Sequence, residues 1–295
     1  MASTLDIYTG HFGLKERPFA LAPDPDYLFW SAQHERAYTM IEYGILTRAP
    51  ITVITGDIGA GKTTLVHYVM KSMDEDLTFA LVSNVQGGRG DLLRWVLQAL
   101  DQEARGTDYV DLFGQLQDFL IAEYAAGRRT VLIFDEAQAL EREMLEELRM
   151  LTNINVGKDD LLQLILVGQP ELRDNIRNGG LTQLAQRITA SFHLTPMEAT
   201  TVRKYVDHRL KVAGGSGKIF SSEAIKLVVD VSRGVPRLVN QVCDLAMVYA
   251  FSEGKSTVEP WMIQNAMRDG AFWYSVDLPE SAASQSATTA YRSAT

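Results

Sequence analysis

Residues 56–63 read Gly56-Asp57-Ile58-Gly59-Ala60-Gly61-Lys62-Thr63, and Thr64 follows them. The spacing G-x-x-x-x-G-K-[ST] is typical of the loop that binds the phosphates of a nucleoside triphosphate. An apolar run at 51–55 precedes the loop, and a helix-compatible stretch at 63–71 follows it. Phosphate binding needs this order, because the curled backbone and the positive end of the helix both point at the phosphates. We therefore predict a phosphate-binding loop between a strand and a helix.

Two side chains of this loop carry its chemistry. Lys62 is expected to place its charge near the β- and γ-phosphates, and Thr63 to offer its hydroxyl to Mg²⁺. The implied ligands are ATP and Mg²⁺. The alternative interpretation is a glycine-rich turn that happens to contain a lysine, and the flanking strand and helix argue against it. The other loop residues expected to contact the nucleotide are Gly56, Asp57, Ile58, Gly59, Ala60, Gly61 and Thr64.

A pair of carboxylates follows another apolar run. Residues 130–134 predict a buried strand, and Asp135 and Glu136 come directly after it. Ligands of parallel sheets bind beyond the carboxyl ends of the strands. We predict that Asp135 holds Mg²⁺, directly or through water, and that Glu136 orients and deprotonates the attacking water. An acidic helix cap is the alternative for these two residues.

Three more polar residues are candidates for the same site. Gln169 follows the apolar run at 162–167, and its amide would point at the γ-phosphate if that strand lies between the two motif strands. Arg187 precedes the last predicted strand, and Arg237 begins a later helix. A guanidinium suits the spread charge of a phosphoryl-transfer transition state. The alternatives are a turn residue for Gln169 and surface ion pairs for the arginines.

Strand and helix patterns alternate through the middle of the chain. The strands read as continuous apolar runs, as in a buried parallel sheet. This predicts an α/β fold with a five-stranded parallel sheet flanked by helices. The expected strands lie at 51–55, 78–83, 130–134, 162–167 and 191–194, and the expected helices at 63–71, 91–100, 110–125, 141–151 and 170–177.

After about residue 195 the strand signal ends, and a small all-helical domain is expected. Its helices are predicted at 197–212, 221–231, 236–251 and 259–269. The last residues are rich in Ser, Ala and Thr without periodicity, which predicts disorder. The expected domains are an aromatic- and proline-rich N-terminal linker segment at 1–48 with a helix at 32–46, a nucleotide-binding core at 49–195, a helical lid at 196–272 and a tail at 273–295.

Composition excludes several classes of protein. Hydrophobic residues make up 46% and charged residues 22% of the 295 residues, as in a globular protein. No apolar run approaches the ~20 residues of a membrane span, and the N-terminus lacks a signal-peptide pattern. We therefore expect no membrane span. The single cysteine, Cys243, allows no internal disulfide, which favours a cytoplasmic location. The net charge of −9 argues against a protein that lives mainly on nucleic acid.

In their order along the chain, the motifs resemble those of AAA+ ATPases of the general secretion pathway protein A (ExeA) type. The resemblance covers about residues 7–270. It rests on Phe12-Gly13-Leu14, Pro18-Phe19, Pro23-Asp24-Pro25, the phosphate loop, Asp135-Glu136-Ala137-Gln138, Leu145-Glu146-Glu147-Leu148-Arg149, Gly168-Gln169-Pro170-Glu171-Leu172, Gln186-Arg187-Ile188, Phe192-His193-Leu194 and Gly234-Val235-Pro236-Arg237.

The resemblance implies roles for the remaining candidates. Arg187 matches the arginine finger, which reaches a neighbouring subunit's nucleotide, and Arg237 matches the sensor 2 arginine of the lid. Gln169 takes the sensor 1 place, where other AAA+ proteins more often carry Asn, Ser or Thr. Phe12 and Phe19 are candidates for an adenine pocket, with core packing as the alternative. An arginine supplied in trans makes hydrolysis depend on a homo-oligomer, either a ring or a filament.

Two tasks fit such a motor. The first is an assembly ATPase, peripheral at the inner membrane, with a protein partner in an envelope secretion or export machine. The second is a transposition regulator that forms rings or filaments on duplex DNA, with Arg89 in the loop 86–90 contacting phosphate; a plain surface loop is the alternative there. A non-hydrolysing switch is disfavoured by the intact Glu136. Secretion-type relatives commonly continue into a membrane span and a peptidoglycan-binding domain, and neither is recognisable in these residues.

Overall fold

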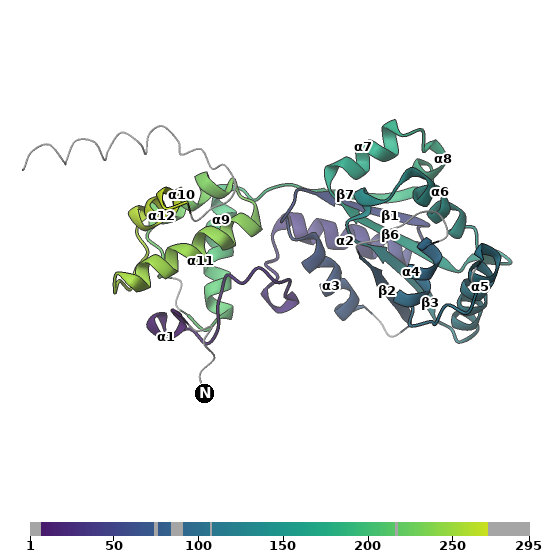
Figure 1. Cartoon of the computed structure of the whole chain (residues 1–295), viewed down its shortest axis with the longest axis horizontal. Helices are drawn as coiled ribbons and strands as arrows, with labels where there is room; N and C mark the ends of the chain where they lie inside the picture. The colour runs from purple at the N-terminus through teal and green to yellow at the C-terminus, as the bar shows by residue number, and fades with distance from the viewer. Residues whose placement is uncertain (1–6, 74–75, 84–90, 107, 216–217, 271–295) are drawn as a thin grey trace, which may run out of the picture. The chain divides into compact units, whose positions relative to one another are not determined.

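The computed structural model describes residues 7–73, 76–83, 91–106, 108–215 and 218–270. They fall into two compact units (Figure 1). The core unit comprises residues 23–195, and the helical unit combines residues 1–22 with 196–295, as far as these are described. The predicted tail at 273–295 and the loop 86–90 lie outside the described residues.

A parallel sheet of five strands forms the centre of the core unit. Its strands are β1 (Ile51–Gly56), β2 (Leu77–Val82), β3 (Arg129–Phe134), β6 (Leu162–Gly168) and β7 (Ile188–Leu194). Their order is β2-β3-β6-β1-β7, and each neighbouring pair is parallel. The predicted α/β fold is confirmed. All five carboxyl ends lie at one edge of the sheet, which is where such sheets bind ligands.

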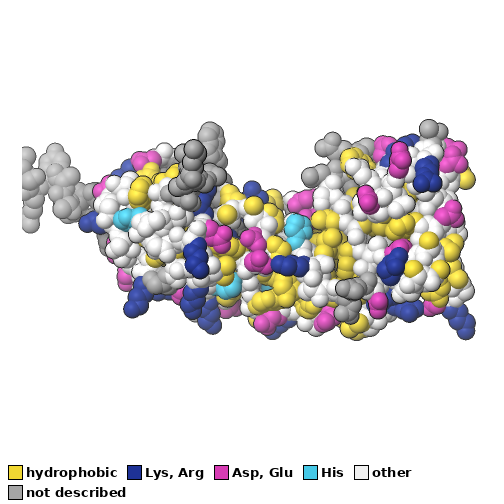
Figure 2. Space-filling model, turned by 90° about the horizontal axis from the view of Figure 1, so that it is seen from below, with side chains coloured by type: hydrophobic (Ala, Val, Ile, Leu, Met, Phe, Trp, Pro, Cys, Tyr) yellow, Lys and Arg dark blue, Asp and Glu magenta, His cyan; other side chains and the backbone are white. Residues whose placement is uncertain are grey.

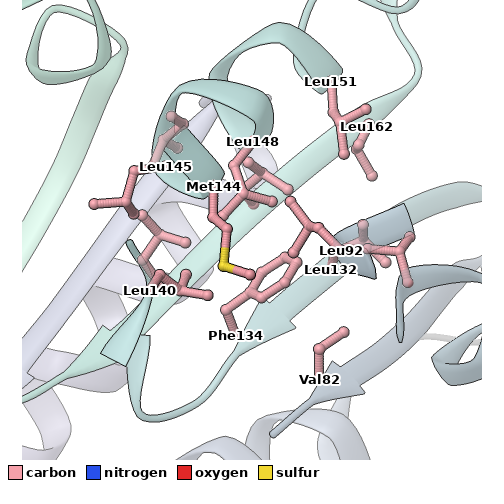
Figure 3. Close-up of a cluster of buried hydrophobic side chains, with 14 of the residues drawn as sticks. Val82, Leu92, Leu132, Phe134, Leu140, Met144, Leu145, Leu148, Leu151 and Leu162 are labelled. Atoms are coloured by element: carbon pink, nitrogen blue, oxygen red, sulfur yellow. The ribbon is translucent and has the colours of Figure 1, made fainter. Parts of the chain in front are cut away.

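Helices cover both faces of this sheet (Figure 1). Successive residues of a strand point to opposite faces. Leu132 and Phe134 of β3 therefore pack against helices on one face (Figure 3), and Val131 and Ile133 pack against helices on the other. The first face carries α4 (Asp91–Ala99), α5 (Tyr109–Ala125), α6 (Arg142–Leu151), α7 (Pro170–Asn178) and α8 (Thr182–Ala185), and the second carries α2 (Ala32–Leu46) and α3 (Lys62–Ser72).

Several short elements of the core unit have no counterpart among the sequence predictions. Two are single 3₁₀ turns, and two are paired antiparallel strands of two residues each. The four-residue α8 is also missed. These elements are shorter than the window over which hydrophobic periodicity can be read. The 3₁₀ turns are η1 (Pro25–Tyr27) and η2 (Ala137–Ala139), and the strands are β4 (Asn155–Val156) and β5 (Asp159–Asp160).

The helical unit contains α1 (Thr9–Phe12), α9 (Ala199–Val212), α10 (Ser222–Ser232), α11 (Pro236–Ser252) and α12 (Pro260–Arg268). Ser221 caps α10, because its side chain accepts a hydrogen bond from the backbone N–H of Ala224. Cys243 of α11 is a free, buried thiol, as expected for a core residue.

Polar contacts hold the N-terminal segment within the helical unit. Arg209 of α9 is buried, and its guanidinium donates to the carbonyl oxygens of Pro18 and Ala20. Asp244 of α11 accepts from the guanidinium of Arg17. Because a buried guanidinium is costly without partners, these contacts fix the segment to the C-terminal helices.

Both kinds of charge are spread over the surface. On the face in Figure 2, acidic and basic side chains are interspersed with apolar ones. The net charge of the chain is −9. Within the described part of the chain, no helix has both the length and the apolar character needed to cross a bilayer.

Candidate nucleotide-binding site

The phosphate loop joins β1 to α3 at the ligand-binding edge of the sheet. Gly59 and Gly61 have φ values of 79° and 95°, in the left-handed region where glycine is favoured. A Cβ on Gly61 would also lie 2.9 Å from Nε2 of His34. The side chain of Ile58 is 65% exposed, so the loop buries no large apolar group there. This backbone fits phosphate oxygens, because positive φ values turn successive N–H groups towards one point.

Lys62 is buried at the start of α3, with 6% of its surface exposed. Its Nζ donates to the carbonyl oxygens of Gly56 at 2.8 Å and Asp57 at 3.0 Å. Burial lowers the pKa of the ammonium, and the nearby carboxylates, Glu136 first, oppose this shift. Neutral carbonyls are weaker partners for an ammonium than an anionic oxygen is. Lys62 is therefore suited to binding a phosphate.

The two predicted motifs meet at Thr63 and Asp135. The hydroxyl of Thr63 donates to Oδ2 of Asp135 at 2.7 Å, and the backbone N–H of Glu136 donates to Oδ1 at 2.9 Å. Hydroxyl and carboxylate oxygens are the ligands that Mg²⁺ prefers, and the ion commonly takes its remaining ligands from phosphates and water. Because both side chains offer such oxygens, this pair fits Mg²⁺ bound together with a nucleotide.

Glu136 is the second residue after β3 and has a left-handed conformation, with φ 55° and ψ 36°. Its Oε2 accepts from the side-chain amide of Gln138 at 2.6 Å and from that of Gln169 at 3.2 Å. β6 lies between β3 and β1, so the condition set for Gln169 is met. The structure brings Gln169 to the predicted base, and its role in sensing phosphate remains a prediction.

Sequence reasoning missed two residues of this site. Gln138 belongs to the quoted Asp135–Gln138 motif, but its position in a motif did not reveal what it contacts. His34 of α2 is buried. Its Nδ1 forms a hydrogen bond of 2.8 Å with the hydroxyl of Ser31, and its ring also forms a hydrogen bond with the backbone of Ala60. Burial lowers the pKa of His34, and the bond to Ala60 opposes this. His34 thus supports the phosphate loop from outside.

Arg187 lies at the opposite end of β7 from this edge. Ile188 pairs with Ile51 at the start of β1, whereas the phosphate loop follows the end of β1. The seven residues of β7 rise ~3.3 Å each, which places Arg187 about 20 Å from the ligand-binding edge. Its guanidinium donates to the hydroxyl of Thr152 at 3.0 Å and to the side chain of Asn153. Within its own chain, Arg187 is therefore remote from the phosphate loop.

The other candidates lie in the helical unit. Phe19 is 1% exposed, and its ring meets that of Phe220 edge-on at 6.0 Å, which is the geometry of core packing. Phe12 is half-buried and meets His11 edge-on at 4.7 Å. A contact of either ring with adenine stays a prediction.

Arg237 is exposed in the first turn of α11. The preceding Gly234 has φ 78°, and a Cβ on it would lie 2.0 Å from the carbonyl oxygen of Met197. The backbone N–H of Met197 in turn donates to the carbonyl oxygen of Gly234 at 2.9 Å. This close approach of two backbones fixes where α11 begins and so where Arg237 is presented. The sensor role of Arg237 stays a prediction.

The sheet order, the phosphate loop after β1 and the acidic pair after β3 define a P-loop ATPase fold of the AAA+ class. A family model described as AAA domain matches residues 45–176. The chain is 39% identical over 256 residues to General secretion pathway protein A of Aeromonas hydrophila. The chain belongs to the AAA+ ATPases of the general secretion pathway protein A type. The match covers 85% of this chain and 46% of that relative, so the chain spans less than half the length of the relative.

Solved structures with low sequence identity share the fold. The ORC2 protein of Aeropyrum pernix matches with a TM-score of 0.65 and 17% identity, over 86% of this chain and 72% of that one. Cdc6p from Pyrobaculum aerophilum matches with a TM-score of 0.67 and 14% identity, over 89% and 74% of the two chains. These likenesses concern the fold alone, and they agree with the AAA+ class.

Proposed function

We propose that the chain binds ATP with Mg²⁺ and hydrolyses it at the interfaces of a homo-oligomer, to assemble or remodel an envelope secretion or export machine. One observation carries the catalytic part of this proposal. Thr63 and Asp135, which are 72 positions apart, are joined by a 2.7 Å hydrogen bond beside the buried Lys62. The two halves of a nucleotide site thus lie at one edge of the sheet.

Binding is assigned to the residues at the start of α3. The backbone N–H groups of the loop would donate hydrogen bonds to phosphate oxygens, and Lys62 would exchange its two carbonyl partners for the β- and γ-phosphates. Thr63 and Asp135 would hold Mg²⁺. The chemistry that such an ion would supply is neutralisation of the charge on the phosphates.

The proton transfer is assigned to Glu136. The carboxylate takes the proton of the attacking water, as a general base within hydrogen-bond reach of that water. Its Oε2 already accepts two amide donors, so we assign the proton to Oε1. Gln169 holds the carboxylate from the end of β6 and would also meet the γ-phosphate.

Assembly enters through the arginines. Arg187 lies about 20 Å from the ligand-binding edge of its own sheet by the rise of β7, which supports a role at a neighbour's nucleotide. Arg237 would contact the nucleotide from the helical unit, acting as a lid from about residue 196. Loss of the γ-phosphate would then be coupled to a change in the position of the lid.

The identity to a secretion protein supports the cellular task. It favours an envelope machine over the duplex-DNA alternative. That alternative was based on Arg89, which lies outside the described residues. We place the protein in the cytoplasm, peripheral at the inner membrane, with a protein partner in the machine.

Glu136→Gln tests the reaction, because it preserves the shape of the side chain and removes the base. We expect phosphate release to fall by at least about 100-fold. ATP binding should persist, and an ATP-bound oligomer should accumulate, which light scattering would detect. Glu143→Gln, at an exposed position in the first turn of α6, is the matched control. Hydrolysis at the wild-type rate in Glu136→Gln would overturn the assignment.

A further inference from the structure

We infer that Gln138 is a positioning residue that ties the carboxylate of Glu136 to the end of β6. The inference rests on the proposed role of Glu136 as the base. The side-chain amide of Gln138 forms its hydrogen bonds with Glu136 and Gln169, and not with the phosphate loop or with Thr63 and Asp135. It acts through Glu136 and Gln169.

Gln138 uses both ends of its amide. Its Nε2 donates to Oε2 of Glu136 at 2.6 Å, and its Oε1 accepts from the backbone N–H of Gln169 at 2.9 Å. The side chain of Gln169 closes the arrangement by donating to the same Oε2 at 3.2 Å. Because an amide group is planar and rigid, its two hydrogen bonds fix the distance between the ends of β3 and β6.

Gly168 provides the space for this bridge. Its φ is not in the left-handed region, so the backbone conformation does not require glycine. A Cβ at this position would lie 2.8 Å from Oε1 of Gln138, 3.2 Å from the backbone N of Gln138 and 3.0 Å from Cδ2 of Leu172. The absence of a side chain on Gly168 therefore allows Gln138 to approach β6 closely enough to bond Gln169.

The bridge links the base to the strand that presents Gln169. A movement of the backbone at Gln169 pulls on Oε1 of Gln138, and the amide transmits this to Oε2 of Glu136. The position of the base therefore depends on the end of β6, next to where Gln169 is proposed to meet the γ-phosphate. Without the bridge, Glu136 retains one amide donor, the side chain of Gln169, and the rotamers of its carboxylate are less restricted.

Two substitutions separate the halves of the bridge. Gln138→Glu keeps an oxygen that can accept from the N–H of Gln169, and it replaces the donor to Glu136 by a like charge. Gln138→Leu loses both bonds while filling similar space. Hydrogen exchange of the Gln169 backbone N–H, measured in protein without nucleotide, reports the acceptor bond directly.

We expect the N–H of Gln169 to exchange about 5- to 10-fold faster in Gln138→Leu, as the loss of one ordinary hydrogen bond predicts, and at the wild-type rate in Gln138→Glu. The N–H of Leu172, which donates to the carbonyl oxygen of Gln169 at 3.0 Å, should exchange unchanged and shows that the effect is local. In both variants the kcat for hydrolysis should fall by about 10- to 100-fold with nucleotide affinity unchanged.

Gly168→Ala gives an independent perturbation of the same contact. It should accelerate exchange at Gln169 in the wild-type background and add little in Gln138→Leu, where the bond is already lost. Wild-type exchange at Gln169 in Gln138→Leu would mean that the bridge does not form. Faster exchange with unchanged kcat, or a loss of nucleotide binding instead of kcat, would exclude a positioning role. The exchange result holds whether or not Glu136→Gln abolishes hydrolysis, so the two proposals can fail separately.

Discussion

Arg187 offers a test of whether one chain completes the site of another. Arg187→Ala keeps an intact phosphate loop, and Lys62→Ala keeps an intact Arg187. Each variant alone should lose hydrolysis. For an arginine finger the expected loss is ~10³- to 10⁵-fold, which corresponds to ~4–7 kcal/mol of transition-state stabilisation. Nucleotide affinity should be retained in Arg187→Ala, because Arg187 is about 20 Å from the ligand-binding edge of its own sheet by the rise of β7.

Mixing the two variants should restore part of the activity. In a head-to-tail assembly with random mixing at equal amounts, about one quarter of the interfaces join an intact loop to an intact Arg187. Phosphate release per chain should therefore recover to about one quarter of the wild-type rate. A mixture of wild type with the double variant Lys62→Ala/Arg187→Ala gives the same fraction of complete interfaces and serves as the matched control.

No recovery in the mixture, with about half of the wild-type rate in the control, would refute the reasoning from the length of β7, because each wild-type chain would then complete its own site. Weakened nucleotide binding in Arg187→Ala would likewise assign this residue to its own chain's site.

Two further predictions concern the support of the phosphate loop. Burial lowers the pKa of His34 below its usual 6.5, so the unfolded chain takes up the proton first as the pH falls. The free energy of unfolding should therefore decrease from about pH 6.5 down to the pKa of the folded state, with a slope of up to ~1.4 kcal/mol per pH unit. Thermal unfolding of His34→Gln should lack this slope, and equal slopes in the two proteins would contradict the burial argument. Gly61→Ala should weaken nucleotide binding by about 10-fold or more, because left-handed strain of ~1–3 kcal/mol adds to the 2.9 Å contact with His34. Gly127 has φ 79° and open space at the position of a Cβ, so Gly127→Ala is a control that introduces backbone strain away from the phosphate loop. This variant should bind nucleotide normally.

The fold was predictable where apolar runs are continuous. β1 and β3 are buried on both faces, and their predicted bounds agree with the structure within one residue. β7 begins at Ile188, three residues before the predicted start, because it is an edge strand. Thr189 and Ser191 are exposed on it, so its beginning alternates in polarity instead of forming an apolar run. The hairpin of β4 and β5 turns at Gly157, whose φ is 64°, and its two-residue strands carry no periodic signal.

The site was predictable where its residues are contiguous in a motif. The spacing of the phosphate loop and of the Asp135–Glu136 pair was enough to predict that the two motifs lie at the same edge of the sheet, as they do. Gln138 reaches Gln169, 31 positions further along the chain, only because β6 inserts beside β3. His34 reaches the loop through the packing of α2, and a histidine in an amphipathic helix carries no signal of that contact. Composition encodes neither contact: strand order decides that of Gln138, and the packing of α2 decides that of His34.

Calorimetric titration of a non-hydrolysable ATP analogue with Mg²⁺ tests most directly whether the loop and the acidic pair hold a nucleotide. We expect one nucleotide per chain in the wild type, and at least about a 10-fold loss of affinity in Lys62→Ala, because two charge-assisted bonds to phosphate disappear. Lys71→Ala, which removes an exposed lysine paired with Asp26, should bind as the wild type does. A folded Lys62→Ala protein with wild-type affinity would contradict the account.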